Sequence, residues 1–365
     1  MKQTYFITGF PGFLAEGLLA QLFSDHLNKI NHVYLLVLPS TISHAKFQLS
    51  HFTTKYDLNI QQFTLIEGDI TLPDLGLDLE TQHISRDVTH VFHLAAIYDL
   101  AVPKKLAYKV NVTGTDNVNE WVKTLPQLER YIYFSTAYVA GKREGTIYET
   151  DLVHHEAFKN FYEETKYLAE LSVESLKNEL PITIIRPGIV KGHSVTGKTI
   201  KFDGLYFFLN FFDKLKYSPI IPMVGQKSVE GNFVPSDYVI KATSFLAIHD
   251  VGINKTYHLT DPSPYQMPEI YTMLLKEYLN RKPLFFISIS LTKQLLNYPR
   301  VRKWLKVEKE AIDYFTYDAR YDTTLAQKDL LLGNIECPNF KDTLPSMIEF
   351  YQRYKDDYAK HIKIK

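Results

Sequence analysis

The first half of the chain alternates short, continuous apolar runs with segments whose apolar residues recur at helical spacing. The apolar runs cover residues 4–8, 33–38, 63–66, 91–94, 131–134 and 182–185, and such runs are typical of strands buried on both faces. Between the first two, Leu14, Leu18 and Leu22 recur at helical spacing, which predicts a helix. Strands that alternate with helices predict a doubly wound α/β fold, in which helices cover both faces of a parallel sheet.

After Pro187 this alternation weakens, and the rest of the chain is predicted to be mainly helical. Helices are expected at residues 267–280, 291–297, 307–315 and 344–359. Two pieces, around 232–247 and 256–259, are expected to return to the sheet. We therefore predict a sheet domain at 1–194, with returning segments at about 232–262, and a smaller, mainly helical lobe at 195–231 and 263–365.

Composition and charge exclude several classes of partner. The chain has 41 basic and 41 acidic residues, so it has no net field to attract nucleic acid or an anionic membrane. Its single cysteine, Cys337, cannot form an internal disulfide or a cysteine metal site. Because no His or Cys pair has the spacing of metal ligands either, we expect neither a metal nor a nucleic-acid partner.

The apolar segments also predict where the protein is located. No stretch approaches the roughly 18 uncharged apolar residues of a membrane span, and the longest candidate, 204–224, is interrupted by Asp213, Lys214 and Lys216. The first residues, MKQTYFITGFPGF, lack the apolar core and small-residue cleavage region of a signal peptide. We therefore expect a cytoplasmic protein without stable membrane insertion.

A glycine-rich segment, TGFPGFLA at 8–15, joins the first predicted strand to the first predicted helix. Gly9 permits a tight turn, Gly12 lets the backbone approach a phosphate at the helix N-terminus, and Ala15 allows close packing of helix and strand. An ordinary strand-to-helix turn is the alternative interpretation. The position directly after the first strand favours a dinucleotide site.

A second motif pairs Tyr162 with Lys166, four residues apart on one face of a predicted helix. A nearby ammonium stabilises a phenolate and lowers its pKa, so the phenol can exchange a proton with a carbonyl oxygen. Chance matches are expected among 25 tyrosines, and Tyr351 and Lys355 have the same spacing. Only the first pair is preceded by a strand-linked hydroxyl, Thr136, whose position after a parallel strand predicts that it faces the ligand crevice.

In this order, the motifs resemble the extended short-chain dehydrogenase/reductase superfamily, from residue 2 to about residue 259. The resemblance is carried by TGFPGFLA (8–15), VYLLVLP (33–39), EGDI (67–70), HLAAIYDL (93–100), NVTGT (111–115), FSTAYVAG (134–141), YEETK (162–166) and IIRPGIVKGHSVTGKTIKFDG (184–204). The last block most resembles the thioester-reductase and fatty acyl-CoA reductase branch. The resemblance therefore implies a Rossmann domain and an NAD(P)H-dependent oxidoreductase.

The resemblance also implies roles for individual residues. Thr136 would bind the substrate carbonyl, Tyr162 would be the general acid, Lys166 would hold the nicotinamide ribose, and Asn111 would support their hydrogen bonds. The implied cofactor-binding residues are Thr8, Gly9, Phe10, Pro11, Gly12, Phe13, Leu14, Leu38, Ser40, Asp69, Ile70, Ala95, Ala96, Lys166, Pro187 and Gly188. Substrate contacts are expected from Tyr98, Ala137 and Tyr206, and the aromatic run 206–212 is either lobe core or an apolar wall for an acyl chain.

The substrate implied by the branch is an acyl thioester, on coenzyme A or on a carrier protein supplied in trans, reduced to an aldehyde or alcohol. Nucleotide-sugar epimerases and dehydratases, and reductases of free aldehydes or ketones, share the same core and remain alternatives. A nucleotide-binding sensor without turnover is an alternative of another class.

The residues after the second predicted strand favour NADPH over NADH. An acidic residue there would bind a 2′-hydroxyl and repel a 2′-phosphate, but the chain has Leu38, Pro39, Ser40 and Thr41. The arginine common in this branch is also absent, which leaves Ser40, Thr41 and Lys46 as candidate phosphate partners. We therefore expect a lower dissociation constant for NADPH than for NADH in a binding titration; tighter binding of NADH would contradict this expectation.

Overall fold

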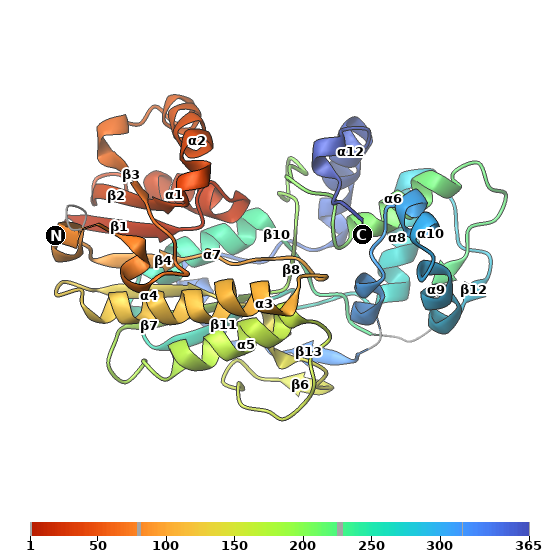
Figure 1. Cartoon of the computed structure of the whole chain (residues 1–365). Coiled ribbons are helices and arrows are strands. Elements are labelled where there is room, and N and C mark those ends of the chain that lie inside the picture. Colours follow the sequence, from red (N-terminus) through yellow and green to blue (C-terminus); the bar gives the residue numbers. More distant parts are fainter. Residues whose placement is uncertain (1, 79–81, 225–228, 316, 365) are drawn as a thin grey trace.

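A parallel seven-stranded sheet forms the centre of the computed structural model, which describes residues 2–78, 82–224, 229–315 and 317–364 (Figure 1). The strand order is β11–β7–β5–β4–β1–β2–β3. The strands are β1 (Gln3–Thr8), β2 (Ile30–Val37), β3 (Phe63–Glu67), β4 (His90–His93), β5 (Arg130–Phe134), β7 (Ile182–Pro187) and β11 (Lys255–Leu259). The predicted doubly wound α/β fold is confirmed.

The order of the strands reverses at β1, which lies between β2 and β4. At the carboxyl end of β1, Thr8 pairs in register with Leu36 of β2 and His93 of β4. Ligands of open α/β sheets bind at such a switch point, outside the carboxyl ends of the strands. The fold therefore brings the glycine-rich segment and the loop after β4 to one edge of the sheet.

Helices cover both faces of the sheet. One face packs against α1 (Phe13–His26), α2 (Ile42–Lys55) and α7 (Ser236–Ile248), and the other against α4 (Gly114–Lys123) and α5 (Phe161–Glu174). In α1, Leu18 and Leu22 are fully buried, as their helical spacing predicts. The segments expected to return to the sheet do so, because α7 packs on α1 and β11 pairs with β7.

The lobe lies beside the sheet (Figure 1, right) and has its own apolar core. Its helices are α6 (Tyr206–Leu215), α8 (Met267–Leu279), α9 (Ile289–Leu296), α10 (Pro299–Leu305) and α12 (Leu344–Tyr354). The two-residue strands β9 (Met223–Val224) and β12 (Phe286–Ile287) pair within it. No helix in the described part of the chain is long and apolar enough to span a bilayer.

Two details of the lobe differ from the prediction. The helix expected at 307–315 is a 3₁₀ segment, Glu310–Phe315, and α10 precedes it. The left-handed conformation of Lys306 (φ 54°) ends α10 and separates the two pieces. The ranges of the two domains stay a prediction, since residues 225–228 of the lobe range lie outside the described residues.

Two strand pairs attach later segments to the sheet domain. The strand β8 (Ile189–Lys191) pairs with β10 (Phe233–Pro235), and β6 (Gly145–Ile147) pairs with β13 (Ala319–Tyr321). Near β13, the helix α11 (Thr324–Leu330) lies against the sheet edge formed by β11, and its Ala326 and Leu330 are buried in the core that contains α1 and α7.

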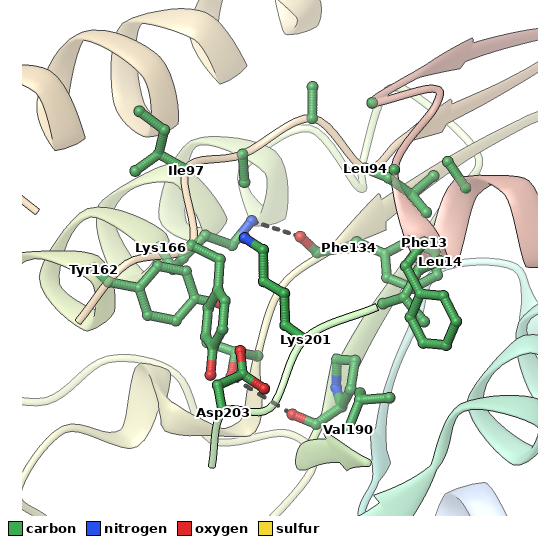
Figure 2. Close-up of a pocket in the computed structure, with 18 of the residues that line it drawn as sticks. Phe13, Leu14, Leu94, Ile97, Phe134, Tyr162, Lys166, Val190, Lys201 and Asp203 are labelled. Atoms are coloured by element: carbon green, nitrogen blue, oxygen red, sulfur yellow. Dashed lines mark hydrogen bonds between the residues drawn. The ribbon is translucent and has the colours of Figure 1, made fainter. Parts of the chain in front are cut away.

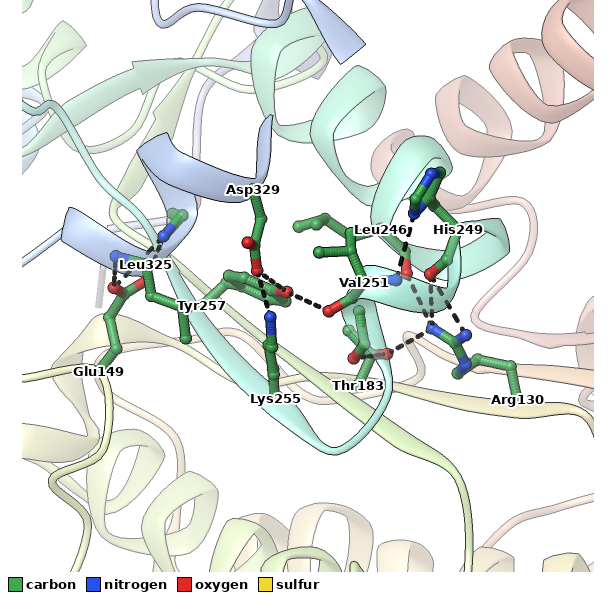
Figure 3. Close-up of polar contacts among 12 residues, drawn as sticks. Arg130, Glu149, Thr183, Leu246, His249, Val251, Lys255, Tyr257, Leu325 and Asp329 are labelled. Atoms are coloured by element: carbon green, nitrogen blue, oxygen red, sulfur yellow. Dashed lines mark hydrogen bonds and ion pairs between the residues drawn. The ribbon is translucent and has the colours of Figure 1, made fainter. Parts of the chain in front are cut away.

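A buried carboxylate attaches α11 to this edge (Figure 3). Glu149 accepts hydrogen bonds from the backbone N–H groups of Leu325 (2.6 Å) and Ala326 (3.1 Å), in the first turn of α11, and of His258 in β11 (3.0 Å). A second carboxylate, Asp329 of α11, accepts from Lys255 Nζ and the Tyr257 hydroxyl, both at 2.7 Å.

Replacing Glu149 with alanine should destabilise the protein strongly, because three N–H groups would lose their acceptor in a buried place. An unsatisfied buried donor costs about 1–3 kcal/mol, so we expect the free energy of unfolding to fall by roughly 3 kcal/mol. Denaturant titration measures this loss. Glu349→Ala is the control: Glu349 is exposed and pairs with the exposed Arg353, so its loss should change the same quantity by less than about 1 kcal/mol. Equal small effects in both variants would contradict the assignment.

Candidate active site

A cavity of about 910 Å³ opens at the carboxyl ends of β1, β4, β5 and β7, where the sheet domain meets the lobe. Its volume is near the upper end of the roughly 300–1,000 Å³ typical of ligand pockets. The sheet domain contributes the glycine-rich segment and the loops after β4 and β5. The lobe contributes Phe207, Met267, Ala311 and Tyr314.

One end of the cavity is shaped to admit a phosphate group close to the backbone. Gly9 has a left-handed conformation (φ 91°), and a Cβ atom there would lie 2.9 Å from the backbone nitrogen of Ala95. At Gly12 a Cβ atom would lie 2.6 Å from the carbonyl oxygen of Gly9. No side chain caps α1 at Gly12, so the first N–H groups of this helix are free to bind an anion.

A buried histidine connects the segments that form this end of the cavity. His93 Nδ1 lies 2.8 Å from the Thr8 hydroxyl, which also accepts a hydrogen bond from the backbone N–H of Ala95 (3.1 Å). The other ring nitrogen of His93 lies 3.1 Å from the hydroxyl of Thr115. Burial lowers the pKa of His93 to about 3, so the ring is neutral at physiological pH. It therefore positions the glycine-rich segment against the loop after β4.

The part of the cavity near the ends of β2 and β3 would accommodate an adenosine. Asp69 and Ile70 line it, and the buried hydroxyl oxygen of the adjacent Thr71 has no hydrogen-bond partner among the described residues. Leu38, Thr41 and His44 lie on the side of β2. The predicted Ser40 is exposed and lies outside the cavity lining, in a 3₁₀ turn.

The remaining predicted cofactor residues, Phe10, Pro11, Phe13, Leu14, Ala96, Pro187 and Gly188, all line the cavity. Together with the Gly9 turn and the uncapped helix, this lining would accommodate a dinucleotide with its adenosine near Asp69 and its nicotinamide near Pro187.

The three predicted catalytic residues meet at the centre of the cavity, where β5 ends and α5 begins. Figure 2 shows Tyr162 and Lys166 on one side of this space and Phe13 and Leu14 on the other. Thr136 is buried, lies 3.5 Å from the carbonyl oxygen of Pro187 and forms a hydrogen bond with Tyr162. Burial raises the pKa of Tyr162 above its ordinary value, and the hydrogen bond with Thr136 opposes this rise. The lowering of this pKa that was expected from Lys166 is therefore not found.

Lys166 is almost completely buried. Its ammonium donates to the Phe134 carbonyl at 2.5 Å and to the Tyr133 hydroxyl at 2.8 Å, and it lies 4.3 Å from the centre of the Tyr133 ring. Burial lowers the pKa of Lys166 to about 7, and the negative charge of Glu170 opposes this effect. The ammonium thus interacts with β5, one helical turn from Tyr162.

A buried ionic network lies behind this centre. Glu170 forms a salt bridge with Arg186 (2.5 Å) and accepts a hydrogen bond from the Ser135 hydroxyl. The Arg186 guanidinium also donates to the carbonyl oxygen of Asp151 at 2.9 Å. These contacts connect α5 with β7 and with the end of β5, which carries Thr136.

Asn111 lies in a π-helical turn, Tyr108–Thr113, a form that often marks functional sites. Its amide exchanges hydrogen bonds with the backbone of Ile97 (2.9 and 3.3 Å) and donates to the Thr165 hydroxyl (3.0 Å). Asn111 therefore positions the loop after β4 against α5, next to Lys166.

The three predicted substrate residues have different surroundings. Tyr98 lines the cavity, and its ring packs edge-on against Tyr162 with ring centres 5.1 Å apart. Ala137 and Tyr206 are buried away from the cavity, whereas their neighbours Tyr138 and Phe207 line it. Most of the aromatic run 206–212 is lobe core, and Phe207 contributes to the cavity wall.

Several lining residues carried no sequence prediction. They include His44, Lys201, Asp203, Glu230, Ala311 and Tyr314. Lys201 and Asp203 belong to the last block of the family resemblance, and that block was the available signal for them. The residues from the lobe become visible as site residues only when the lobe is placed beside the sheet.

The family described as Male sterility protein matches residues 7–243. Relatives include the fatty acyl-CoA reductase wat of Drosophila melanogaster, which is 25% identical over 301 residues, covering 73% of this chain and 56% of the relative. The aldehyde reductase lnbA of Aspergillus flavus is 26% identical over 272 residues, covering 71% of this chain and 26% of the relative. The chain thus spans only about a quarter to a half of the length of these relatives.

Solved structures share the fold over nearly the whole chain. The terminal R domain from the myxalamid PKS-NRPS biosynthetic pathway has a TM-score of 0.80 at 21% identity, covering 99% of this chain and 93% of that domain. A thiolation-reductase di-domain from an archaeal non-ribosomal peptide synthetase has a TM-score of 0.76 at 18% identity, covering 98% of this chain and 76% of the di-domain. These structures share the predicted doubly wound α/β fold, which they therefore confirm.

Adding a methyl group at Gly9 should weaken cofactor binding, because its Cβ atom would clash with the backbone of the loop after β4. We expect Gly9→Ala to raise the NADPH dissociation constant at least about tenfold, or ~1.4 kcal/mol. Gly145→Ala is a matched control, since Gly145 is also left-handed (φ 81°) but a methyl group there would have no atom within 4 Å. Fluorescence titration of both variants separates backbone strain from the clash, and equal affinities in the two would refute the close-approach argument.

Proposed function

Because the chain belongs to the Male sterility protein family, whose match covers residues 7–243, we propose that it is an NAD(P)H-dependent reductase of acyl thioesters. The observation that carries the proposal is the hydrogen-bonded pair of hydroxyl groups, Thr136 and Tyr162, in the cavity that also contains the Gly9 turn. In this arrangement, an acid for a carbonyl oxygen would lie beside the part of the cavity proposed for the nicotinamide.

Each side chain of the site would have its own role in the reduction. The bound nicotinamide, held near Pro187 and Gly188, would supply the hydride. Thr136 and Tyr162 would both hydrogen-bond the substrate carbonyl oxygen, and Tyr162 would donate its proton as charge develops there. Because burial favours the neutral phenol, Tyr162 holds this proton until it is needed. Lys166 would hold the nicotinamide ribose one helical turn from Tyr162, and its pKa, lowered to about 7, would let it exchange protons at neutral pH.

The proposed substrate is an acyl thioester on coenzyme A or on a carrier protein in trans. Support comes from the named activities of the relatives, a fatty acyl-CoA reductase and a thiolation-reductase di-domain. The wall of the cavity also has apolar residues from both domains, including Ile97, Phe207 and Ala311, which suit an acyl chain.

We propose NADPH as the preferred cofactor. Thr41 and His44 line the end of the cavity beyond β2, where a 2′-phosphate would lie, and Leu38 contributes no charge that would repel it. This assignment replaces Ser40 and Lys46 as phosphate partners, because those two residues lie outside the cavity lining.

A second candidate function is the reduction of free aldehydes. The relative lnbA is named an aldehyde reductase, and Thr136 and Tyr162 would act on an aldehyde oxygen in the same way. The two functions are compatible, since the aldehyde is also the product of thioester reduction.

The purified protein should oxidise NADPH in the presence of acyl-CoA thioesters, and Tyr162→Phe should remove this activity. We expect the variant to lose about 10²–10⁴-fold in rate, the usual contribution of a positioned general acid. Absorbance of NADPH across a series of acyl chain lengths measures the rate.

Tyr351→Phe is the matched control, since Tyr351 has the same spacing to a lysine but its hydroxyl donates to Asn210 in the lobe core. It should retain activity. If wild-type protein binds NADPH but oxidises it with no thioester, the thioester proposal fails, and free aldehydes become the substrates to test.

A further inference from the structure

The substrate side of the cavity contains a carboxylate that the proposed reduction leaves without a role. Asp203 lies just before α6 and lines the cavity together with Tyr98, Tyr162 and Lys201. Figure 2 shows Asp203 and Lys201 projecting into the space that Tyr162 borders. Burial raises the pKa of the Tyr98 phenol, and Asp203 is the charged group that adds most to this rise; Tyr98 in turn packs on Tyr162. Asp203 is therefore close to the catalytic centre.

The surroundings of Asp203 suit a group that gives up a proton. Burial raises the pKa of its carboxyl to about 6, and the charge of Lys201 and a hydrogen bond from its own backbone N–H oppose the rise. The ionisable groups that face it are Lys201 on its own segment, Tyr98 from the loop after β4 and Tyr206 from α6. An acid with a pKa near the working pH is the most effective proton donor.

Reduction of a thioester has a chemical requirement that reduction of an aldehyde lacks. Addition of hydride to the thioester carbon gives a tetrahedral adduct that carries a hydroxyl and a sulfur substituent on one carbon. Tyr162 acts at the oxygen of this adduct, so it cannot also protonate the sulfur. A thiol has an ordinary pKa of about 8.5, so an acid placed near the sulfur would speed its departure at neutral pH by supplying a proton.

We propose that Asp203 is the general acid that protonates the departing sulfur; this inference rests on the proposed thioester reductase function. The C–S bond breaks, its electron pair moves to sulfur, and the sulfur takes the proton of the Asp203 carboxyl. The hydroxyl proton of the adduct passes to the Tyr162 phenolate as the carbonyl bond forms. The products are an aldehyde and a thiol, and the Asp203 carboxylate regains its proton from water.

The test compares Asp203→Asn with wild-type protein on an acyl-CoA thioester and on the corresponding free aldehyde. The amide keeps the shape of the side chain but cannot donate this proton. We expect thioester-dependent NADPH oxidation to fall by about 10² or more, while aldehyde reduction changes by less than about twofold. Retained aldehyde reduction shows that the variant is folded and binds cofactor, and Asp203→Glu should recover part of the thioester rate.

A leaving-group series makes the test specific for protonation of sulfur. With aryl thioesters, whose thiols are more acidic than an alkyl thiol, the defect of Asp203→Asn should shrink, because their thiolates leave without help. Glu230→Gln removes a different carboxylate of the cavity wall and should leave the ratio of thioester to aldehyde rates unchanged.

Three results would overturn the inference: an unchanged thioester rate, equal loss on both substrates, or a defect independent of the leaving thiol. Failure of the wild-type protein to use any thioester would instead overturn the proposed function and this inference with it. The two failures are therefore distinguishable.

Discussion

Burial of the Lys166 ammonium is the constraint on which the rest of the site depends. An ammonium removed from water must find hydrogen-bond acceptors and a compensating negative charge, and here these are supplied by Phe134, Tyr133 and Glu170. Glu170 is held in turn by Arg186 of β7. A shift of α5 along the sheet would leave a buried charge without its partners, which is costly. The residues that carry the reactive hydroxyls lie on these same elements and are positioned by the same contacts.

The elements of the sheet domain could be predicted because their signals are local. A continuous apolar run such as 131–134 indicates a strand that is buried on both faces. The spacing of Leu18 and Leu22 indicates which face of a helix is buried. The glycine-rich segment was predictable for the same reason: the turn at Gly9 and the close approach at Gly12 require glycine wherever they occur. Asn111 was predicted from the family resemblance, and the structure adds how it acts, through Ile97 and Thr165.

The rest of the site depends on contacts between residues far apart in the sequence. Tyr206 was predicted to touch the substrate, but the rotation of about 100° between successive helical residues places Phe207 at the cavity instead. The lobe residue Tyr314 comes to the site only through the packing of two domains. The short helix α10 begins with Pro299 and spans too few turns for its apolar spacing to be recognised.

The attachment of α11 to the sheet edge has a consequence for how the protein is made. Tyr257 and Lys255 of the edge strand β11 donate hydrogen bonds to the carboxylate of Asp329. The carboxylate of Glu149 accepts hydrogen bonds from the backbone N–H groups of Leu325 and Ala326. On the ribosome, these edge groups emerge long before the residues that satisfy them. The N-terminal part of the sheet can assemble early during synthesis, but the side chains of its last strand lack their partner until Asp329 has been translated.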